Sequence, residues 1–202
     1  MKLECFLQNA EMINDKFNII PLLYGSLGLE VLTNSSLNAG DIDILIPQVF
    51  VTGDKWKEFK SFLESHGYTL IDEHEHTFRK DGVDYSYASI DGLKEFADID
   101  VCDIEIRNVN GAKFMLLSLE QYLKVYQKSS QDGYRMNVKE KQDNQKIGFI
   151  RNRMNTKIRK AKLGDEKILA YIQTESWKSA FVDIISDEDM EKCTDIAKAE
   201  AM

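Results

Sequence analysis

The stretch YGSLGLEVLTNSSLNAGDIDILIP, residues 24–47, contains the pattern on which the fold depends. An apolar run ends at Gly25 and Ser26, and a second apolar run carries Asp41 and Asp43 at alternate positions. Alternate residues of a strand point to the same face, so the two carboxylates project together while the isoleucines beside them pack on the other side. An ionised carboxylate taken out of water must find a cation or become neutral. The stretch therefore predicts a strand, a turn, a short helix and a second strand that needs a cation.

The composition is that of a globular protein. The chain has 202 residues, 43% of them hydrophobic and 30% charged, with only two prolines, which excludes a disordered or fibrous chain. Its three cysteines lack metal-ligand spacing and are odd in number, so we expect a reducing compartment, the cytoplasm. Residues 1–20 show neither a signal peptide nor a membrane-spanning run, and no membrane partner is expected.

Charge is distributed unevenly along the chain. Residues 1–134 carry 12 basic and 22 acidic side chains, whereas residues 135–167 carry 11 and 4. The net charge of −8 therefore combines an acidic body with a basic segment. Such a segment can attract a phosphate-bearing ligand, or it can simply be a solvated helix face that neutralises its neighbours. The acidic body makes nucleic acid an unlikely partner, because it would repel a phosphate backbone.

Hydrophobic periodicity predicts strands surrounded by helices, which is an α+β protein with a mixed sheet. Pro21 indicates an edge position or a bend in its strand, and Asp54 is expected to cap a helix. An Asp-Gly pair at 81–82 predicts a hairpin, and Ser118 with Gln121 forms a capping-box pattern. The predicted helices are 3–17, 27–32, 56–66, 119–129 and 138–154, and the predicted strands are 17–25, 41–46, 68–72, 76–80, 83–89, 99–107 and 112–117.

The predicted turn and strand point to phosphate chemistry. Carboxylate oxygens of Asp41 and Asp43 are suited to Mg²⁺, and a third acid would allow two ions roughly 4 Å apart to assist an in-line phosphoryl displacement. Gly25 lets the backbone approach a phosphate, and Ser26 with the amides of the following helix supplies donors. These elements predict a site that binds a nucleoside triphosphate through its phosphates and its metals.

The same pattern resembles the nucleotidyltransferase superfamily with the polymerase-beta-like fold. The GSLGLE stretch and the long gap before DID resemble the lincosamide-type antibiotic nucleotidyltransferases and the toxin-type nucleotidyltransferases. The resemblance covers about residues 15–150. It implies that Asp41 and Asp43 bind the metals and that Gly25 and Ser26 hold the β and γ phosphates.

The resemblance also implies a third acid on a later strand. Asp84, just after the predicted hairpin turn, is the first choice, and it would complete the metal site and help deprotonate the acceptor. The alternatives are Asp98, Asp100 and Asp103, or no third acid, in which case the chain is not expected to catalyse the reaction.

A basic residue and an aspartate on a following helix are also typical of the family. Arg135 and Lys141, with Lys139 and Asp143 nearby, resemble that element and would help hold the nucleotide. The chain departs from the family pattern in having no Arg or Lys near the Gly-Ser turn. The phosphates would therefore depend on backbone amides and distant cations.

The sequence changes character after residue 154. Residues 155–202 resemble the first strand and helices of the GNAT acetyltransferase fold, without the later Gly-rich turn that binds acetyl-CoA. We therefore expect two regions, a nucleotidyltransferase-like domain over 1–154 and an incomplete GNAT-like segment over 155–202. The segment is expected to transfer no acetyl group, and a downstream acetyltransferase domain would be its natural partner.

These observations predict an Mg²⁺-dependent enzyme that moves a nucleoside monophosphate from an NTP, with ATP expected, to an acceptor hydroxyl and releases pyrophosphate. A cationic small molecule such as an antibiotic is favoured as acceptor over a protein or tRNA. The alternative is a non-catalytic nucleotidyltransferase-like module that binds or regulates an acetyltransferase. The sequence leaves the acceptor, the base and the oligomeric state open.

Overall fold

The computed structural model of the chain describes residues 2–130, 140–155, 160–181, 184–186 and 189. The chain divides into two compact units, residues 1–155 and 156–202.

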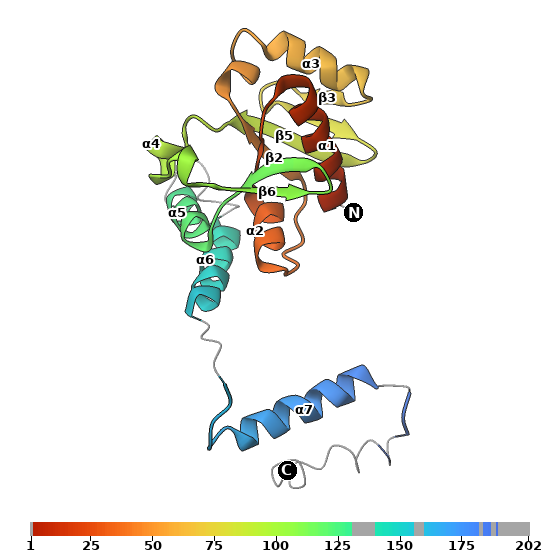
Figure 1. Cartoon of the computed structure of the whole chain (residues 1–202), viewed down its shortest axis with the longest axis vertical. Helices are drawn as coiled ribbons and strands as arrows, with labels where there is room; N and C mark the ends of the chain where they lie inside the picture. Colours follow the sequence, from red (N-terminus) through yellow and green to blue (C-terminus); the bar gives the residue numbers. More distant parts are fainter. Residues whose placement is uncertain (1, 131–139, 156–159, 182–183, 187–188, 190–202) are drawn as a thin grey trace. The chain divides into compact units, whose positions relative to one another are not determined.

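The first unit is a seven-stranded mixed sheet with helices on both faces (Figure 1). The strand order is β3-β4-β5-β2-β1-β7-β6, which confirms the α+β class and the mixed sheet. Its elements are α1 (Lys2–Phe17), β1 (Leu22–Leu23), α2 (Gly25–Thr33), β2 (Ile42–Ile46), η1 (Gln48–Phe50), α3 (Trp56–Ser65), β3 (Thr69–Asp72), β4 (Thr77–Lys80), β5 (Val83–Ser89), α4 (Leu93–Ala97), η2 (Val101–Asp103), β6 (Glu105–Val109), β7 (Ala112–Leu116), α5 (Leu119–Ser129) and α6 (Glu140–Asn155).

Strand pairing places the segments that sequence analysis singled out at the centre of the sheet. The short strand β1 pairs antiparallel with β2 and parallel with β7. Strand β2 pairs on its other side with β5 in parallel, with Asp43 beside Ser86. Strand β5 in turn pairs antiparallel with β4. The aspartate-bearing strand therefore lies between the strand that leads into α2 and the strand that carries Asp84.

The first face of the sheet is an apolar core. Isoleucines 42, 44 and 46 of β2 and the tyrosines 85 and 87 of β5 point to this face, where α1 and α3 cover them. Phe59 of α3 is fully buried and packs edge-on against Tyr87, with ring centroids 5.2 Å apart. Such apolar burial supplies most of the stability of a domain of this size.

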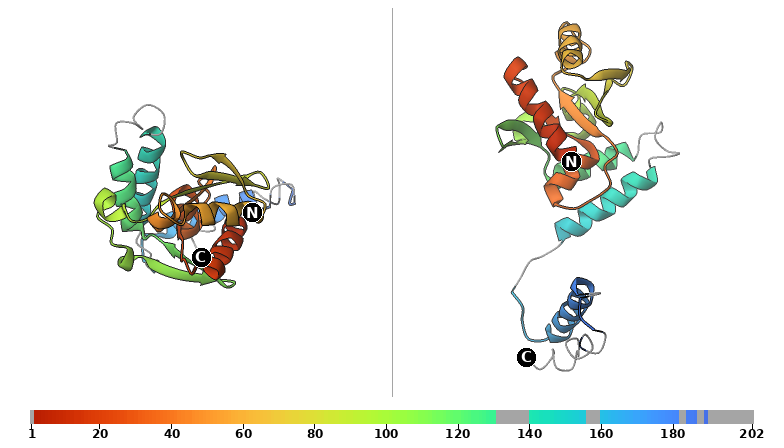
Figure 2. Two further views of the ribbon diagram at one scale, coloured as in Figure 1. Left: turned by 90° about the horizontal axis from the view of Figure 1, so that it is seen from above. Right: turned by 90° about the vertical axis from the view of Figure 1, so that its right-hand side faces the viewer.

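The second face of the sheet, as we call the face that carries Asp43, divides into two halves. Over β1, β2 and β7, residues of α2, α4, α5 and α6 form a second apolar cluster that includes Leu45 and Tyr122. Figures 1 and 2 show α5 and α6 side by side. Over β5 and β4 this face instead carries polar side chains, and Arg79 and Ala88 are exposed. One half is thus covered by helices and the other is open to water.

Some boundaries differ from those that the sequence predicts. An edge position for Pro21 is wrong, because β1 lies between β2 and β7 and the Pro21 carbonyl accepts a bond from the Met115 amide at 2.8 Å. Asp54 does not cap α3, whose N-cap is Lys55. The predicted strand 99–107 is a strand only from Glu105, because it begins with the short helix η2.

The predictions around the hairpins and the later helices are confirmed. The turn at 81–82 joins β4 to β5, and both of its residues have positive φ, as such turns require. Ser118 and Gln121 form the predicted capping box at the start of α5. Turns and capping boxes depend on hydrogen bonds between residues a few positions apart, so the sequence alone can predict them.

The second unit contains α7 (Glu166–Ala180). The acetyltransferase resemblance implies a strand early in this segment, but no strand occurs among the residues that the structure describes after 155. The structure therefore gives no support for the acetyltransferase resemblance, which stays a prediction. In the described part of the chain, no helix has the length and apolarity needed to cross a bilayer.

Candidate functional site

A cavity of about 720 Å³ opens on the covered half of the second face. Its walls come from the start of α2, the loop before β2, β2 itself, α4, α5 and α6. Four residues predicted from the sequence line it together: Gly25, Ser26, Asp41 and Asp43. Polar and aromatic side chains complete the wall, among them Tyr24, Asn38, Phe96, Tyr122, Tyr126, Ser129, Gln142, Asp143, Gln145, Lys146 and Phe149.

The carboxylate of Asp43 lies directly against Gly25. A Cβ atom added to Gly25 would be 1.9 Å from Oδ2 of Asp43, so any other residue there would force the Asp43 carboxylate to move. Gly25 also has a φ of +63°, a left-handed conformation that other residues adopt at a cost. A backbone bond of 2.9 Å from the Tyr24 amide to the Asp43 carbonyl fixes the two segments together. Glycine at position 25 is thus required by both the backbone and the carboxylate.

Helix α2 presents its amino end to the cavity. It begins at Gly25, is nine residues long and has Ser26 in its first turn. The first amides of a helix have no partner within the helix, and the helix dipole adds partial positive charge there. Gly25 and Ser26 are therefore helix residues and not a separate turn. An anion at this end of the cavity would meet amide donors and the Ser26 hydroxyl.

Tyrosines of α5 form the floor of the cavity. The Tyr122 hydroxyl donates to the Leu23 carbonyl at 3.2 Å, and Gly28 leaves room for it, since a Cβ there would be 2.0 Å from that oxygen. Burial raises the pKa of Tyr126, whose buried hydroxyl has no hydrogen-bond partner among the described residues. Burial raises the pKa of Tyr122 as well, so both tyrosines are neutral at physiological pH, and the Tyr122 bond links α5 to the strand that leads into α2.

Helix α6 brings a cation and a buried acid to the cavity. Asp143 is 5% exposed and accepts a hydrogen bond of 2.8 Å from the Ser129 hydroxyl. The Lys146 ammonium lies over the Tyr126 ring, 4.9 Å from its centroid. Lys146 is not among the site residues predicted from the sequence. Its position three residues after Asp143, on the same side of a predicted helix, is the signal that could have identified it.

The two cations predicted to bind the nucleotide, Arg135 and Lys141, cannot be assigned to the cavity from the described residues. Arg135 lies outside the described residues. Lys141 belongs to α6, but its side chain also lies outside what the structure describes. Their roles stay predictions.

Asp84 shares the second face with Asp43 but does not line the cavity. Asp84 lies two residues before Ser86, the partner of Asp43, so its side chain leaves β5 on the same side of the sheet. Its oxygens accept bonds from Nε and Nη2 of Arg79, at 2.6 and 2.8 Å. These hydrogen bonds lower the pKa of Asp84. In this structure the carboxylate of Asp84 is therefore bound to a cation of the protein itself.

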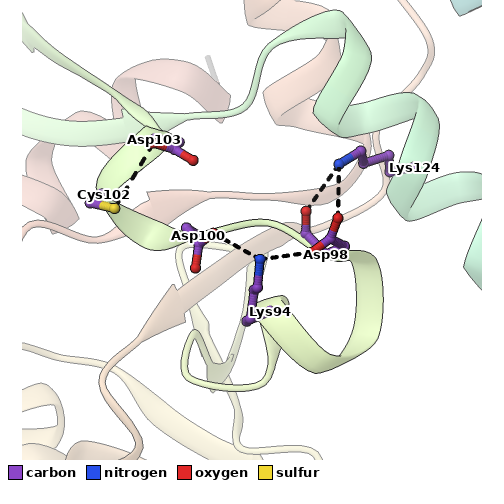
Figure 3. Close-up of polar contacts among 6 residues, drawn as sticks. All are labelled: Lys94, Asp98, Asp100, Cys102, Asp103 and Lys124. Atoms are coloured by element: carbon purple, nitrogen blue, oxygen red, sulfur yellow. Dashed lines mark hydrogen bonds and ion pairs between the residues drawn. The ribbon is translucent and has the colours of Figure 1, made fainter.

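The three alternative acids lie on other elements, near α4 and α5, and not on a strand (Figure 3). Asp98 and Asp100 both pair with Lys94, at 2.7 and 2.8 Å, and Lys124 reaches Asp98 as well. Figure 3 shows Asp103 turned toward Cys102, away from this pair. None of the three lines the cavity. The network links α4 to α5 at the surface.

The donor set at the cavity fits a hard cation only in part. Asp41 and Asp43 supply carboxylate oxygens at one wall, and oxygen ligands are those that Mg²⁺ prefers. Across the described ranges, no three His, Cys, Asp or Glu side chains lie close enough together to hold a metal ion. A third carboxylate would have to move to reach the first two.

Comparison with known proteins defines the class of fold first. No protein-family model matches the chain. A nucleotidyltransferase-like antigenic protein from Paracoccidioides brasiliensis matches 90% of this chain and 92% of its own, with a TM-score of 0.52 and 17% identity. The antibiotic-resistance factor ANT(2'')-Ia matches 76% of this chain and 91% of its own, with a TM-score of 0.45 and 11% identity. The chain has a nucleotidyltransferase-like fold.

Sequence similarity then identifies the family. The chain is 44% identical over 145 residues to the uncharacterized protein YnaI of Bacillus subtilis strain 168. The match covers 72% of this chain and 92% of that protein. The chain belongs to the same family as YnaI.

Proposed function

We propose that the chain is a nucleotidyltransferase, which moves a nucleoside monophosphate from an NTP to an acceptor hydroxyl and releases pyrophosphate. The observation that carries the proposal is the contact of Asp43 with Gly25 inside one cavity. A metal-binding carboxylate and a helix amino end that attracts phosphate are thereby adjacent. The nucleotidyltransferase-like fold supports the same conclusion.

In this proposal the chain contributes positioning and electrostatics. Asp41 and Asp43 would hold Mg²⁺, which supplies charge stabilisation to a transferring phosphoryl group when it is bound. The α2 amides and Ser26 bind the β and γ phosphates, which become the leaving pyrophosphate. Lys146, a cation on the cavity wall, neutralises phosphate charge. Asp84 completes the acidic group and takes the proton of the acceptor hydroxyl.

The acceptor class follows from charge. Residues 1–134 contain ten more acidic than basic side chains, 22 against 12. This field attracts cations and repels a nucleic-acid backbone. We propose a cationic small molecule as acceptor and ATP as the donor.

Label transfer tests the proposal. The purified chain is incubated with Mg²⁺, ATP radiolabelled at the α-phosphate and a panel of hydroxyl-bearing acceptors, and the label on each acceptor is counted. Asp43→Asn should lower transfer at least about 100-fold, because it removes a cation-binding charge from the reacting centre. Asp103→Asn removes the same charge outside the cavity and should leave transfer unchanged. Transfer that survives Asp43→Asn would refute the mechanism.

A second candidate function is a non-catalytic nucleotide-binding module. The pairing of Asp84 with Arg79 favours it, because the described residues then hold no group of three metal ligands. Such a module would bind ATP in the same cavity and transfer no label to any acceptor. Asp43→Asn would then weaken ATP binding without affecting a reaction.

A further inference from the structure

Asp84 is the acid best placed to join the pair on β2. The parallel pairing of β2 with β5 sets Ile42 beside Tyr85 and Asp43 beside Ser86. Continued by one residue, the same register sets Asp41 beside Asp84. Paired strands lie about 4.8 Å apart, and the side chains of neighbouring partners point to the same face. The backbone of Asp84 is thus next to that of Asp41.

The carboxylate of Asp84 is directed to the opposite neighbour. Strand β5 lies between β2 and β4, and β4 places Arg79 directly beside Asp84. Both oxygens of Asp84 accept hydrogen bonds from that guanidinium. Asp84 therefore lies between Arg79 of β4 on one side and the acids of β2 on the other.

The ion pair between Arg79 and Asp84 is accessible to water and can separate at little cost in free energy. The side chain of Arg79 is 53% exposed and that of Asp84 is 33% exposed. Exposed ion pairs contribute little net stability, because water solvates the separated charges well. A guanidinium released at this surface would remain hydrated, so the exchange leaves no unpaired buried charge.

We propose that Arg79 is a positioning residue that holds Asp84 away from the metal site until a divalent cation binds at Asp41 and Asp43. Asp84 then turns from Arg79 toward that cation. The inference rests on the proposed function, since it assumes that Asp41 and Asp43 bind a cation. It assigns to Arg79 the setting of metal affinity at the site.

A Mn²⁺ titration without nucleotide tests the inference, with free Mn²⁺ measured from its electron paramagnetic resonance signal. Arg79→Gln removes the competitor and should tighten Mn²⁺ binding about threefold to fivefold, the range expected for an exposed pair. The same substitution in an Asp84→Asn background should have no effect. Arg79→Lys keeps the charge and should stay close to wild type.

Removing a positive charge could also tighten Mn²⁺ binding through long-range electrostatics alone, and this would give a different pattern among the variants. Lys80→Gln removes the same charge one residue along, from a side chain that packs over Tyr68 on the other face. The inference is overturned if Lys80→Gln tightens binding as much as Arg79→Gln, or if Arg79→Gln acts equally with Asp84→Asn present.

The remaining outcomes separate the inference from the proposed function. If Asp43→Asn abolishes Mn²⁺ binding but Arg79→Gln leaves the Mn²⁺ affinity unchanged, only the role of Arg79 is overturned. Absence of Mn²⁺ binding in every variant overturns both the inference and the metal site of the proposed function. Circular dichroism of each variant confirms that it is folded.

Discussion

Two similar acids have different surroundings in the covered and open halves of the second face. Asp43 and Asp84 leave neighbouring parallel strands on the same side of the sheet. Asp43 lies against Gly25 in a cavity that helices enclose, whereas Asp84 forms an exposed pair with Arg79. The chemistry of an acid is thus set by what covers its strand. The acid in the covered half lines a cavity, and the acid in the open half is paired with a cation of its own chain.

Gly25→Ala alters the covered half and should have the largest effect on the free energy of unfolding and on label transfer. The added methyl group meets Oδ2 of Asp43 at a backbone position with φ of +63°. Gly67 also has a positive φ, +83°, but nothing lies within 4 Å of an added Cβ. Gly67→Ala should cost about 1 to 3 kcal/mol of unfolding free energy from backbone strain alone. Gly25→Ala should cost at least about 1 kcal/mol more, because Asp43 must move.

Urea denaturation of the two alanine variants measures this difference. Label transfer should be lost with Gly25→Ala and retained with Gly67→Ala. Equal destabilisation of both variants would show that Asp43 does not press on Gly25.

Lys146→Gln should have an intermediate effect within the covered half. We expect about tenfold weaker ATP binding, because a charge-assisted bond to phosphate is lost. Arg151 is an exposed cation on the same helix that does not line the cavity, so Arg151→Gln is the matched control. Isothermal titration of ATP with Mg²⁺ measures both variants. Equal affinities for the two variants would remove Lys146 from the site.

Arg79→Gln in the open half should give the smallest effect, a small loss of thermal stability that depends on pH. Hydrogen bonds from Arg79 lower the pKa of Asp84 in the folded state below its value in the unfolded chain. The stability from this pair is therefore present above the unfolded pKa of about 4, and is lost as the pH falls through the lower folded value. The melting temperature of Arg79→Gln should lie slightly below wild type at pH 7. The two should converge as the pH falls below about 4, whereas a gap that persists in acid would contradict the assignment.

The sequence predicts the parts of this protein that depend on local patterns. Alternation in β2 and the glycine at the start of α2 were enough to place Gly25, Ser26, Asp41 and Asp43 around one cavity. The capping box of Ser118 was likewise confirmed, because its bonds span only three residues.

The features that the sequence did not predict depend on contacts between distant segments. Arg79 and Asp84 are an exception, because they are only five residues apart and the predicted turn at 81–82 already sets them opposite each other on β4 and β5. Lys146 reaches the cavity because α6 packs beside α5. The short length of β1 has the same origin, since only two of its residues find partners on both sides.

The central claim is that the cavity around Asp43 is the reacting centre. The most direct test measures transfer of the α-phosphate label by three asparagine variants side by side. The account predicts that Asp43→Asn abolishes transfer, that Asp84→Asn lowers it less, and that Asp103→Asn matches wild type. Undiminished transfer by the Asp43→Asn protein would contradict the assignment of the cavity as the reacting centre.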